Sequence, residues 1–166
     1  MSLEVTLRAS YLIGDSFNQG EPMSQQGVVE IAKAQITAYN EKNWGAATEA
    51  LGPTVVYDEV GTNRKLTGAA QVIDAWKGWA TALPDSKATF DATHVAGNTV
   101  ILELTWRGTH RGPLQTPAGQ IPATGKPIEI RACQIIEVKD GKVMVVRHYF
   151  DMATMLAQLG VSSIGA

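Results

Sequence analysis

The segment IEIRACQIIEVKDGKVMVVRHYF, residues 128–150, decides the fold. Apolar residues alternate with polar ones over 128–138 and again over 143–150, which is typical of strands whose two faces meet different surroundings. Residues 139–142, with the sequence KDGK, separate the two runs. Asp-Gly between alternating runs is a strong hairpin signal, because both residues tolerate the positive φ that a tight turn requires. The segment therefore predicts two long antiparallel strands.

Two further alternating runs lie upstream of this hairpin. Residues 88–95 and 99–110 are joined by Gly97 and Asn98, which predicts a second hairpin. Residues 111–126 are rich in Gly and Pro and predict a loop between the two hairpins.

The N-terminal half and the extreme C-terminus carry helical patterns. Apolar residues spaced by three and four predict helices over 24–40, 44–51 and 69–82 and a short last helix over 151–159. Gly52 and Pro53 are expected to end the second helix, and Asp151 is expected to cap the last one. A small early hairpin is expected to pair residues 55–59 with 65–67.

This order of elements shows no alternation of strand and helix, so a parallel sheet is not expected. It predicts an α+β fold in which a strongly curved, cone-shaped antiparallel sheet packs against three N-terminal helices, with a short C-terminal helix. The cone domain is expected over residues 24–161, between a flexible or loosely docked arm of residues 1–23 and a tail of residues 162–166. The interior of the cone is where a ligand would fit.

Composition excludes several classes of protein. The chain has 166 residues, 45% hydrophobic and 18% charged, and a formal net charge of −2. Lys and Arg are scattered singly, so neither a nucleic acid nor a membrane is an expected partner. No apolar run approaches the roughly 18–20 residues of a membrane span, and residues 1–22 lack the order of a signal peptide. Cys133 is the single cysteine, which excludes an intrachain disulfide and fits a cytoplasmic location.

The alternation also predicts which side chains face the interior. The expected inward residues are Val100, Leu102, Leu104, Trp106 and His110 on one strand, Ile128, Ile130, Ala132, Gln134 and Ile136 on the next, and Met144, Val146, His148 and Phe150 on the last. Three of them are polar, namely His110, Gln134 and His148. Tyr57 and Asp58 occupy opposite faces of the first strand, so one of them is also expected to point inward. The outward face of the last strand is half apolar, which favours a homodimer.

Four sequence segments together resemble the SnoaL-like polyketide cyclase family, within the nuclear-transport-factor-2-like or ketosteroid-isomerase-like fold. The segments are His110-Arg111-Gly112, IPATGKP at 121–127, VKDGKV at 138–143 and LAQLG at 156–160, and the likeness runs from about residue 27 to 161. The family includes cofactor-free aldol cyclases, in which an aspartate on the last strand is the acid/base and a histidine assists. The resemblance puts His148 at the position of that aspartate and Gln134 at that of the histidine. It puts Tyr57 at the position of a pocket amide.

The resemblance and the strand pattern together suggest an enzyme that works without a cofactor. His148 is the expected base, because an imidazole has an intrinsic pKa suited to proton transfer near pH 7. Gln134, Tyr57 and His110 are expected to stabilise charge on a substrate oxygen, and Asp58 to orient a histidine or act as a base. The expected substrate is a small, hydrophobic, cyclic carbonyl compound, and the residues expected to contact it are Trp76, Trp79, Trp106, Leu104 and Phe150.

Structural interpretations of the same residues stay open. His148 can be a core histidine, His110 can anchor the neighbouring loop, and Asp58 can be a solvated strand-end residue. Trp76 and Trp79 fit a core as well as a flat wall for a ring-shaped ligand. No inward carboxylate pairs clearly with the two histidines, so no metal is expected. The alternatives to a cyclase, isomerase or lyase are a non-catalytic small-molecule-binding module and a domain whose pocket is vestigial.

Overall fold

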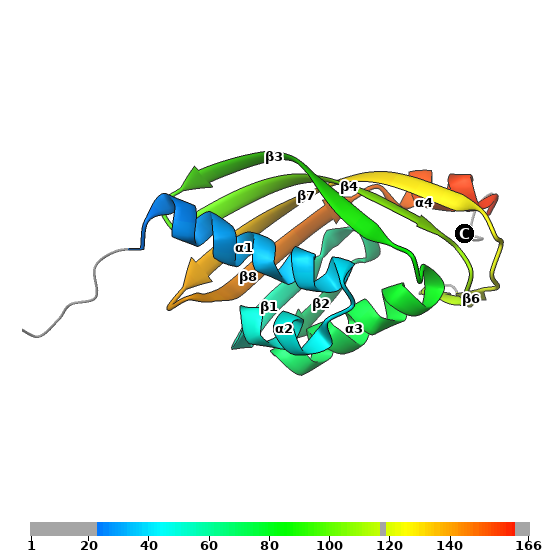
Figure 1. Cartoon of the computed structure of the whole chain (residues 1–166). Coiled ribbons are helices and arrows are strands. Elements are labelled where there is room, and N and C mark those ends of the chain that lie inside the picture. Colours follow the sequence, from blue (N-terminus) through cyan, green and yellow to red (C-terminus); the bar gives the residue numbers. More distant parts are fainter. Residues whose placement is uncertain (1–22, 117–118, 162–166) are drawn as a thin grey trace, which may run out of the picture.

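The computed structural model describes residues 23–116 and 119–161. Within them the chain forms four α-helices, one 3-10 helix and eight strands (Figure 1). In chain order these are α1 (Gln25–Asn40), α2 (Trp44–Ala50), β1 (Leu51–Glu59), η1 (Val60–Thr62), β2 (Arg64–Thr67), α3 (Ala69–Ala82), β3 (Lys87–Ala96), β4 (Thr99–Thr109), β5 (Leu114–Thr116), β6 (Gly119–Ile121), β7 (Pro127–Lys139), β8 (Lys142–Phe150) and α4 (Met152–Leu159). The α+β class is confirmed, whereas the expected arm and tail lie outside the described residues except for Met23.

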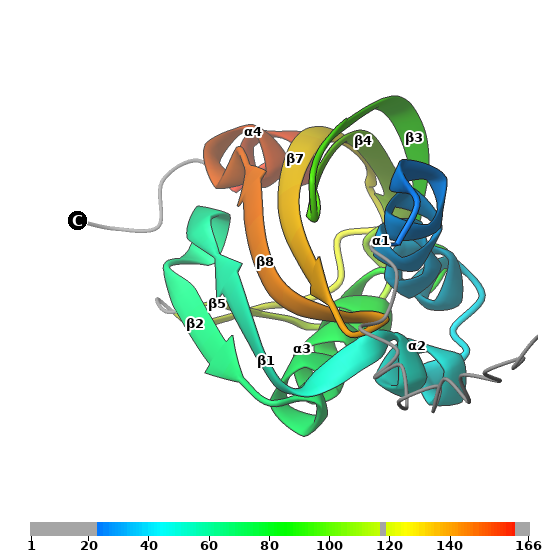
Figure 2. The same ribbon diagram turned by 90° about the vertical axis from the view of Figure 1, so that its left-hand side faces the viewer.

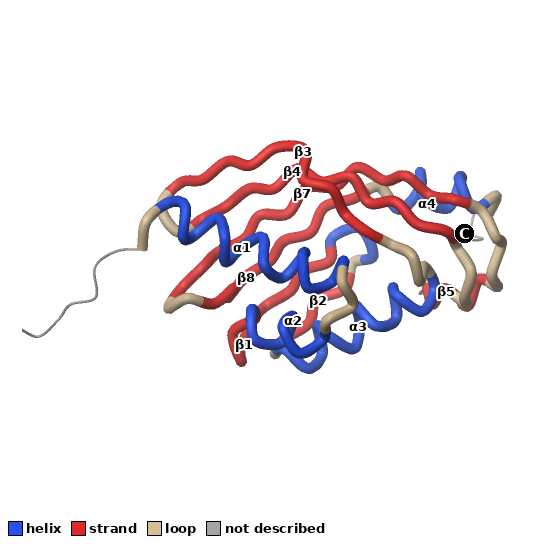
Figure 3. The backbone as a smooth tube through the Cα atoms, viewed as in Figure 1, coloured by secondary structure: helices blue, strands red, loops and turns tan. Residues whose placement is uncertain are grey.

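Six strands form one sheet in the order β2-β1-β8-β7-β4-β3, and β5 pairs with β6 in a separate two-stranded ribbon (Figure 3). The helices α1, α2 and α3 lie on one side of the large sheet, and α4 packs beside β7 (Figure 2). The two hairpins predicted from the sequence, β3–β4 and β7–β8, are present and antiparallel.

The expectation of a purely antiparallel sheet is wrong, because β1 pairs with β8 in parallel. The sheet is therefore mixed. Hairpin signals report only strands that are neighbours in sequence, and β1 and β8 are separated by most of the domain. The strong curvature of the predicted cone is not confirmed, since neither sheet is strongly curled.

Several element boundaries and one residue's orientation also differ from the sequence prediction. Leu51 and Gly52 belong to β1 and not to the end of a helix, because Leu51 pairs with Val143 of β8. The loop between the hairpins contains β5 and β6. Val143 alternates with the expected inward residues Met144 and Val146, yet it is fully buried, because an irregularity in the β7–β8 pairing after Glu137 brings it opposite Val138.

The helix ends follow the capping chemistry of the sequence. The Ser24 hydroxyl accepts from the amide of Gly27, and Asn43 accepts from the amide of Ala46. As predicted, the Asp151 carboxylate caps α4, and it accepts from the amides of Ala153 and Thr154 at 2.9 and 3.1 Å. These bonds satisfy amides that the first helical turn leaves without intrahelical partners.

Two hydrophobic clusters hold the elements together. The larger one lies between the helices α1 to α3 and the middle of the sheet, and includes Ile36, Val72, Leu102 and Ile136. The smaller one joins the end of α3 to α4 through Ala82, Leu83, Leu114, Ile128, Ile130, Met155 and Leu159. Residues of both clusters border the cavity described below.

No helix in the described part of the chain is both long and apolar enough to cross a bilayer. On the sheet, Phe90, Ile101 and Tyr149 are large apolar side chains that are exposed to solvent. Exposed apolar groups of this kind are compatible with the homodimer expected from the sequence, which stays a prediction.

The close approach of the loop at Gly112 to the end of α3 yields a stability prediction. The amides of Arg111 and Gly112 both donate to the carbonyl of Ala82, and a Cβ on Gly112 would collide with the carbonyl oxygen of Thr81. Gly112→Ala should therefore lower the free energy of unfolding by about 1–3 kcal/mol, measured by urea denaturation.

Gly78→Ala is the matched control for that substitution. Gly78 lies inside α3, and a Cβ there meets no atom within 4 Å. Alanine should raise the free energy of unfolding at this position by roughly 0.5–1 kcal/mol, because glycine is the poorer helix former. Equal effects of the two substitutions would contradict the described packing of the loop on α3.

Candidate active site

A cavity of about 670 Å³, including its opening to solvent, lies between the two hydrophobic clusters. Its walls come from α1, β1, α3, β4, β7, β8 and α4. Most lining residues are apolar or aromatic: Ile36, Tyr39, Tyr57, Trp76, Trp79, Leu83, Trp106, Ile128, Ile130, Phe150 and Met155. The remaining lining residues are Glu59, Ser86, Gln134 and His148. A mainly apolar hollow with a few polar groups is the usual form of a small-molecule site.

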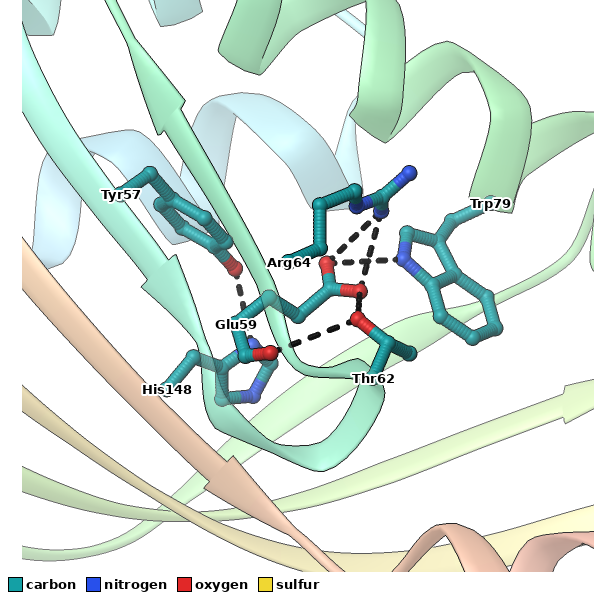
Figure 4. Close-up of polar contacts among 6 residues, drawn as sticks. All are labelled: Tyr57, Glu59, Thr62, Arg64, Trp79 and His148. Atoms are coloured by element: carbon teal, nitrogen blue, oxygen red, sulfur yellow. Dashed lines mark hydrogen bonds and ion pairs between the residues drawn. The ribbon is translucent and has the colours of Figure 1, made fainter. Parts of the chain in front are cut away.

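Tyr57 and His148 form a hydrogen-bonded pair in this cavity. The Tyr57 hydroxyl lies 2.8 Å from His148 Nδ1 (Figure 4). The parallel register of β1 and β8 creates the pair, because it sets Tyr57 opposite Val146 and Glu59 opposite His148, all facing the helices. Both members of the pair are buried, with 2% of Tyr57 and 8% of His148 exposed.

Burial keeps both members of the pair uncharged. It lowers the pKa of His148 to about 4, although the negative charge of Glu59 acts in the opposite direction. Burial raises the pKa of Tyr57 well above its usual range, and the charge of Glu59 adds to that increase. At neutral pH the pair is thus a phenol beside a neutral imidazole. The direction of their shared hydrogen bond decides which nitrogen of His148 carries the proton.

Glu59 is a buried carboxylate with a complete set of partners. Only 1% of the residue is exposed. Its carboxylate accepts from the Thr62 hydroxyl at 2.5 Å, from Arg64 Nη2 at 3.0 Å to each oxygen, and from Trp79 Nε1 at 3.1 Å (Figure 4). A charge buried in this way is tolerated because it is paired and hydrogen-bonded. Glu59 therefore contributes a fixed negative charge to the wall of the cavity.

Glu59 is not among the site residues predicted from the sequence. The alternation of β1 places it on the same face as Tyr57, and this was a signal that could have identified it. Its partners come from η1, β2 and α3, and nothing in the local sequence shows that these segments meet.

Gln134 lies on β7 beside the Tyr57–His148 pair, opposite His148 in the β7–β8 register. It is buried, and its Oε1 accepts from Gln35 Nε2 of α1 at 3.3 Å. The interaction holds the Gln134 side chain from the helix side. The amide nitrogen of Gln134 is then the end of the side chain that can donate a hydrogen bond to a ligand.

Two buried nitrogens on the cavity wall lack a hydrogen-bond partner among the residues that the structure describes. They are His148 Nε2 and Trp106 Nε1. Leaving one buried donor or acceptor unsatisfied costs about 1–3 kcal/mol, so most such groups in proteins are paired. Both atoms belong to residues that line the cavity, which makes them candidate contacts for a bound molecule.

Three residues expected in the site lie elsewhere. His110 is buried but follows the end of β4, and its Nδ1 contacts the Thr124 hydroxyl at 3.0 Å and the Thr124 amide at 3.3 Å. It holds the loop, which is the structural alternative considered for it. Asp58 lies on the face of β1 opposite Tyr57, and Leu104 is enclosed in the larger hydrophobic cluster. None of the three lines the cavity.

The other predicted contact residues do reach the cavity. Trp76 and Trp79 line it from α3, Trp106 from β4 and Phe150 from β8. The imidazole of His148 lies close to two of these rings, with centroid separations of 5.0 Å to Phe150 and 6.2 Å to Trp106. Within residues 23–116 and 119–161, no three His, Cys, Asp or Glu side chains are grouped so as to hold a metal ion.

The fold and the cavity define the class of the protein. The model of the SnoaL-like polyketide cyclase family matches residues 29–159, and the chain belongs to that family. Among curated proteins, no sequence matches this chain closely enough to count as a relative.

Solved structures share the fold of this chain. A putative hydroxylase from Streptomyces galilaeus, AclR, superposes with a TM-score of 0.72 at 18% identity, covering 84% of this chain and 89% of that one. IdmH, a putative polyketide cyclase from Streptomyces antibioticus, gives 0.70 at 25% identity, with 81% and 99% covered. A Catenulispora acidiphila protein with a ketosteroid isomerase-like fold gives 0.69 at 18% identity, with 82% and 97% covered.

The lowered pKa of His148 makes stability depend on pH. The unfolded chain has the ordinary histidine pKa near 6.5, so between about pH 6.5 and pH 4 it binds a proton that the folded state excludes. The folded state should thus lose stability as the pH falls through this window, by about 2 kcal/mol between pH 7 and pH 5.

Urea denaturation of wild type and His148→Asn at both pH values measures this contribution. Carboxylates that titrate in both proteins cancel in the comparison, so the wild type should lose about 2 kcal/mol more than the variant. The same pH dependence in both proteins would mean that His148 keeps an ordinary pKa in the folded state.

Proposed function

We propose that this protein is a cofactor-independent acid/base enzyme that removes a proton next to a carbonyl group of a small, hydrophobic, cyclic compound. The observation that carries the proposal is the imidazole of His148, which is held at Nδ1 by Tyr57 while its buried Nε2 has no partner among the described residues. Membership of the SnoaL-like polyketide cyclase family supports enzyme chemistry of this kind.

His148 acts as a base in one of its two neutral tautomers. In that tautomer Nδ1–H donates to the Tyr57 oxygen, and Nε2 carries the lone pair. Nε2 takes the proton from the substrate carbon, and the electron pair of the broken C–H bond forms the enolate. The carboxylate of Glu59 favours the imidazolium that results, since its charge raises the pKa of His148.

The pKa of His148 restricts the substrate. A base with a pKa of about 4 is fully unprotonated at neutral pH but has a weak affinity for protons. It suits carbon acids that are already acidic, such as a carbon between two carbonyl groups. Of the three side chains expected to bind the substrate oxygen, Gln134 and Tyr57 line the cavity, whereas His110 lies outside it.

The walls of the cavity favour a flat, ring-shaped guest. Trp76, Trp79, Trp106 and Phe150 present aromatic surface from three different elements. Aromatic faces pack well against planar rings and offer few competing polar groups. Once formed, the enolate can be reprotonated at another carbon, as in an isomerase, or can attack a second carbonyl, as in an aldol cyclase.

Hydrogen exchange on a cyclic β-keto ester tests the proposal. In deuterium oxide, wild-type protein should accelerate incorporation of deuterium between the two carbonyls of ethyl 2-oxocyclohexanecarboxylate, followed by NMR. His148→Asn should slow the protein-dependent exchange by about 10²–10⁴-fold, the usual contribution of a positioned general base.

His94→Asn is the matched control, because His94 is an exposed histidine on β3 that lies away from the cavity. This variant should keep the wild-type rate. Tight binding of the ester by wild type without any exchange would favour the non-catalytic binding module instead. Equal exchange by wild type and His148→Asn would remove His148 from the mechanism.

The pH profile of the exchange reports the pKa of the base in the free enzyme. The protein-dependent value of kcat/KM should be flat between about pH 6 and pH 8 and should fall with a midpoint near 4, where His148 becomes protonated. Glu59→Gln should move that midpoint lower still, because it removes the charge that favours the imidazolium. A wild-type midpoint near 6.5 would show a solvated histidine and contradict the assignment.

A further inference from the structure

Trp106 differs in its hydrogen bonding from Trp79, another tryptophan on the cavity wall. Trp79 donates its indole N–H to the carboxylate of Glu59 at 3.1 Å. Trp106 Nε1 is buried, yet none of the described residues accepts from it. An indole N–H is only a donor, so the partner that it lacks must be an acceptor.

The indole of Trp106 is held in place by its neighbours. Trp106 lies in the interior of β4, paired with Ile130 of β7 on one side and Ala88 of β3 on the other. The ring of Tyr39 packs edge-on against it at a centroid distance of 5.1 Å. A side chain fixed in this way loses little conformational entropy when its N–H binds a ligand.

The imidazole of His148 lies next to this indole. The two ring centroids are 6.2 Å apart with an interplanar angle of 49°, and no hydrogen bond joins the rings among the described contacts. In the tautomer required of a base, His148 offers an acceptor at Nε2. Neighbouring points on one wall of the cavity thus offer one donor and one acceptor, and both are unpaired.

We propose that Trp106 Nε1–H binds the carbonyl oxygen of the substrate, beside the carbon from which His148 removes a proton. This assignment rests on the proposed function and adds Trp106 to Gln134 and Tyr57 as a group that binds the oxygen. A carbonyl with an adjacent C–H complements the wall, since its oxygen is an acceptor and its acidic hydrogen points to a base. Trp106 is then a catalytic residue and more than a flat aromatic surface.

The step balances with the groups in the cavity. The proton passes from the α-carbon to His148 Nε2, and the C–H electron pair becomes the C=C bond of the enolate. The carbonyl π pair moves onto the oxygen, which becomes an anion and accepts a stronger hydrogen bond from Trp106. Return of the proton from Nε2 to carbon restores the imidazole, so no other reactant is consumed.

This role predicts that the site distinguishes C=O from C=CH2. Cyclohexanone and methylenecyclohexane have nearly the same shape, but only the ketone carries an acceptor. Protein labelled with 15N at the tryptophan indoles gives one N–H signal for each of its four tryptophans, and Trp106→Phe identifies the signal of Trp106. Cyclohexanone should move the Trp106 signal downfield, and methylenecyclohexane should move it several-fold less.

Two outcomes of this titration overturn the assignment. They are equal movement of the Trp106 signal with both compounds, and a Trp106 signal that cyclohexanone leaves in place up to the solubility limit. The measurement needs no turnover. A ketone-specific shift in a protein that does not accelerate deuterium exchange of the ester would therefore support the carbonyl-binding site and contradict only the proposed catalysis. In His148→Asn the ketone-specific shift should persist.

The kinetic consequence is measured with the β-keto ester. Trp106→Phe retains an aromatic ring but removes the N–H, and it should lower the kcat of exchange by about 10²-fold, as loss of one oxyanion donor does in other enzymes. Trp44→Phe is the matched control, because Trp44 begins α2 outside the cavity wall, and it should keep the wild-type rate. An undiminished kcat in Trp106→Phe would exclude the indole from the transition state.

Discussion

The hydrogen bond between Tyr57 and His148 is the interaction on which the site depends, and the parallel pairing of β1 with β8 creates it. The two strands are far apart in sequence, and their register sets Glu59 opposite His148 and Tyr57 two residues earlier. One strand pair therefore brings a phenol, a carboxylate and an imidazole to the same face of the sheet. A slip of one residue in β1 would turn both Tyr57 and Glu59 to the opposite face.

Glu59 and His148, two polar residues of the cavity wall, differ in charge because they differ in their hydrogen-bond partners. Glu59 keeps its charge because Thr62, Arg64 and Trp79 satisfy both carboxylate oxygens. His148 has one partner only, so burial removes its charge and leaves one nitrogen without a described partner. A neutral imidazole beside a fixed negative charge is suited to take up a proton for a short time, since the charge lowers the cost of the imidazolium.

Sequence patterns predicted the parts of the fold that depend on local chemistry. The Asp140-Gly141 turn, the Asp151 cap and the alternation along β7 are short-range features, and they placed Gln134 and His148 on the inner face. The family resemblance covered residues from about 27 to 161, and the family match over residues 29–159 confirms it.

The remaining features depend on contacts between distant segments. The parallel β1–β8 pairing has no hairpin signal, and the partners of Glu59 meet only after η1, β2 and α3 have packed. His110 continues the alternation of β4 in sequence, but the strand ends at Thr109 and the histidine turns to Thr124. Alternation predicts which face of the sheet a residue occupies within a strand, but it does not predict the residue at which tertiary contacts end the strand.

The protonation state of His148 tests the account most directly. Two-dimensional 15N NMR of the imidazole at pH 7 distinguishes the two neutral tautomers from the imidazolium. The account predicts a neutral ring with its proton on Nδ1, directed at the Tyr57 oxygen, and an unprotonated Nε2. An imidazolium, or a neutral ring protonated at Nε2, would leave the cavity without its base and contradict the proposed chemistry.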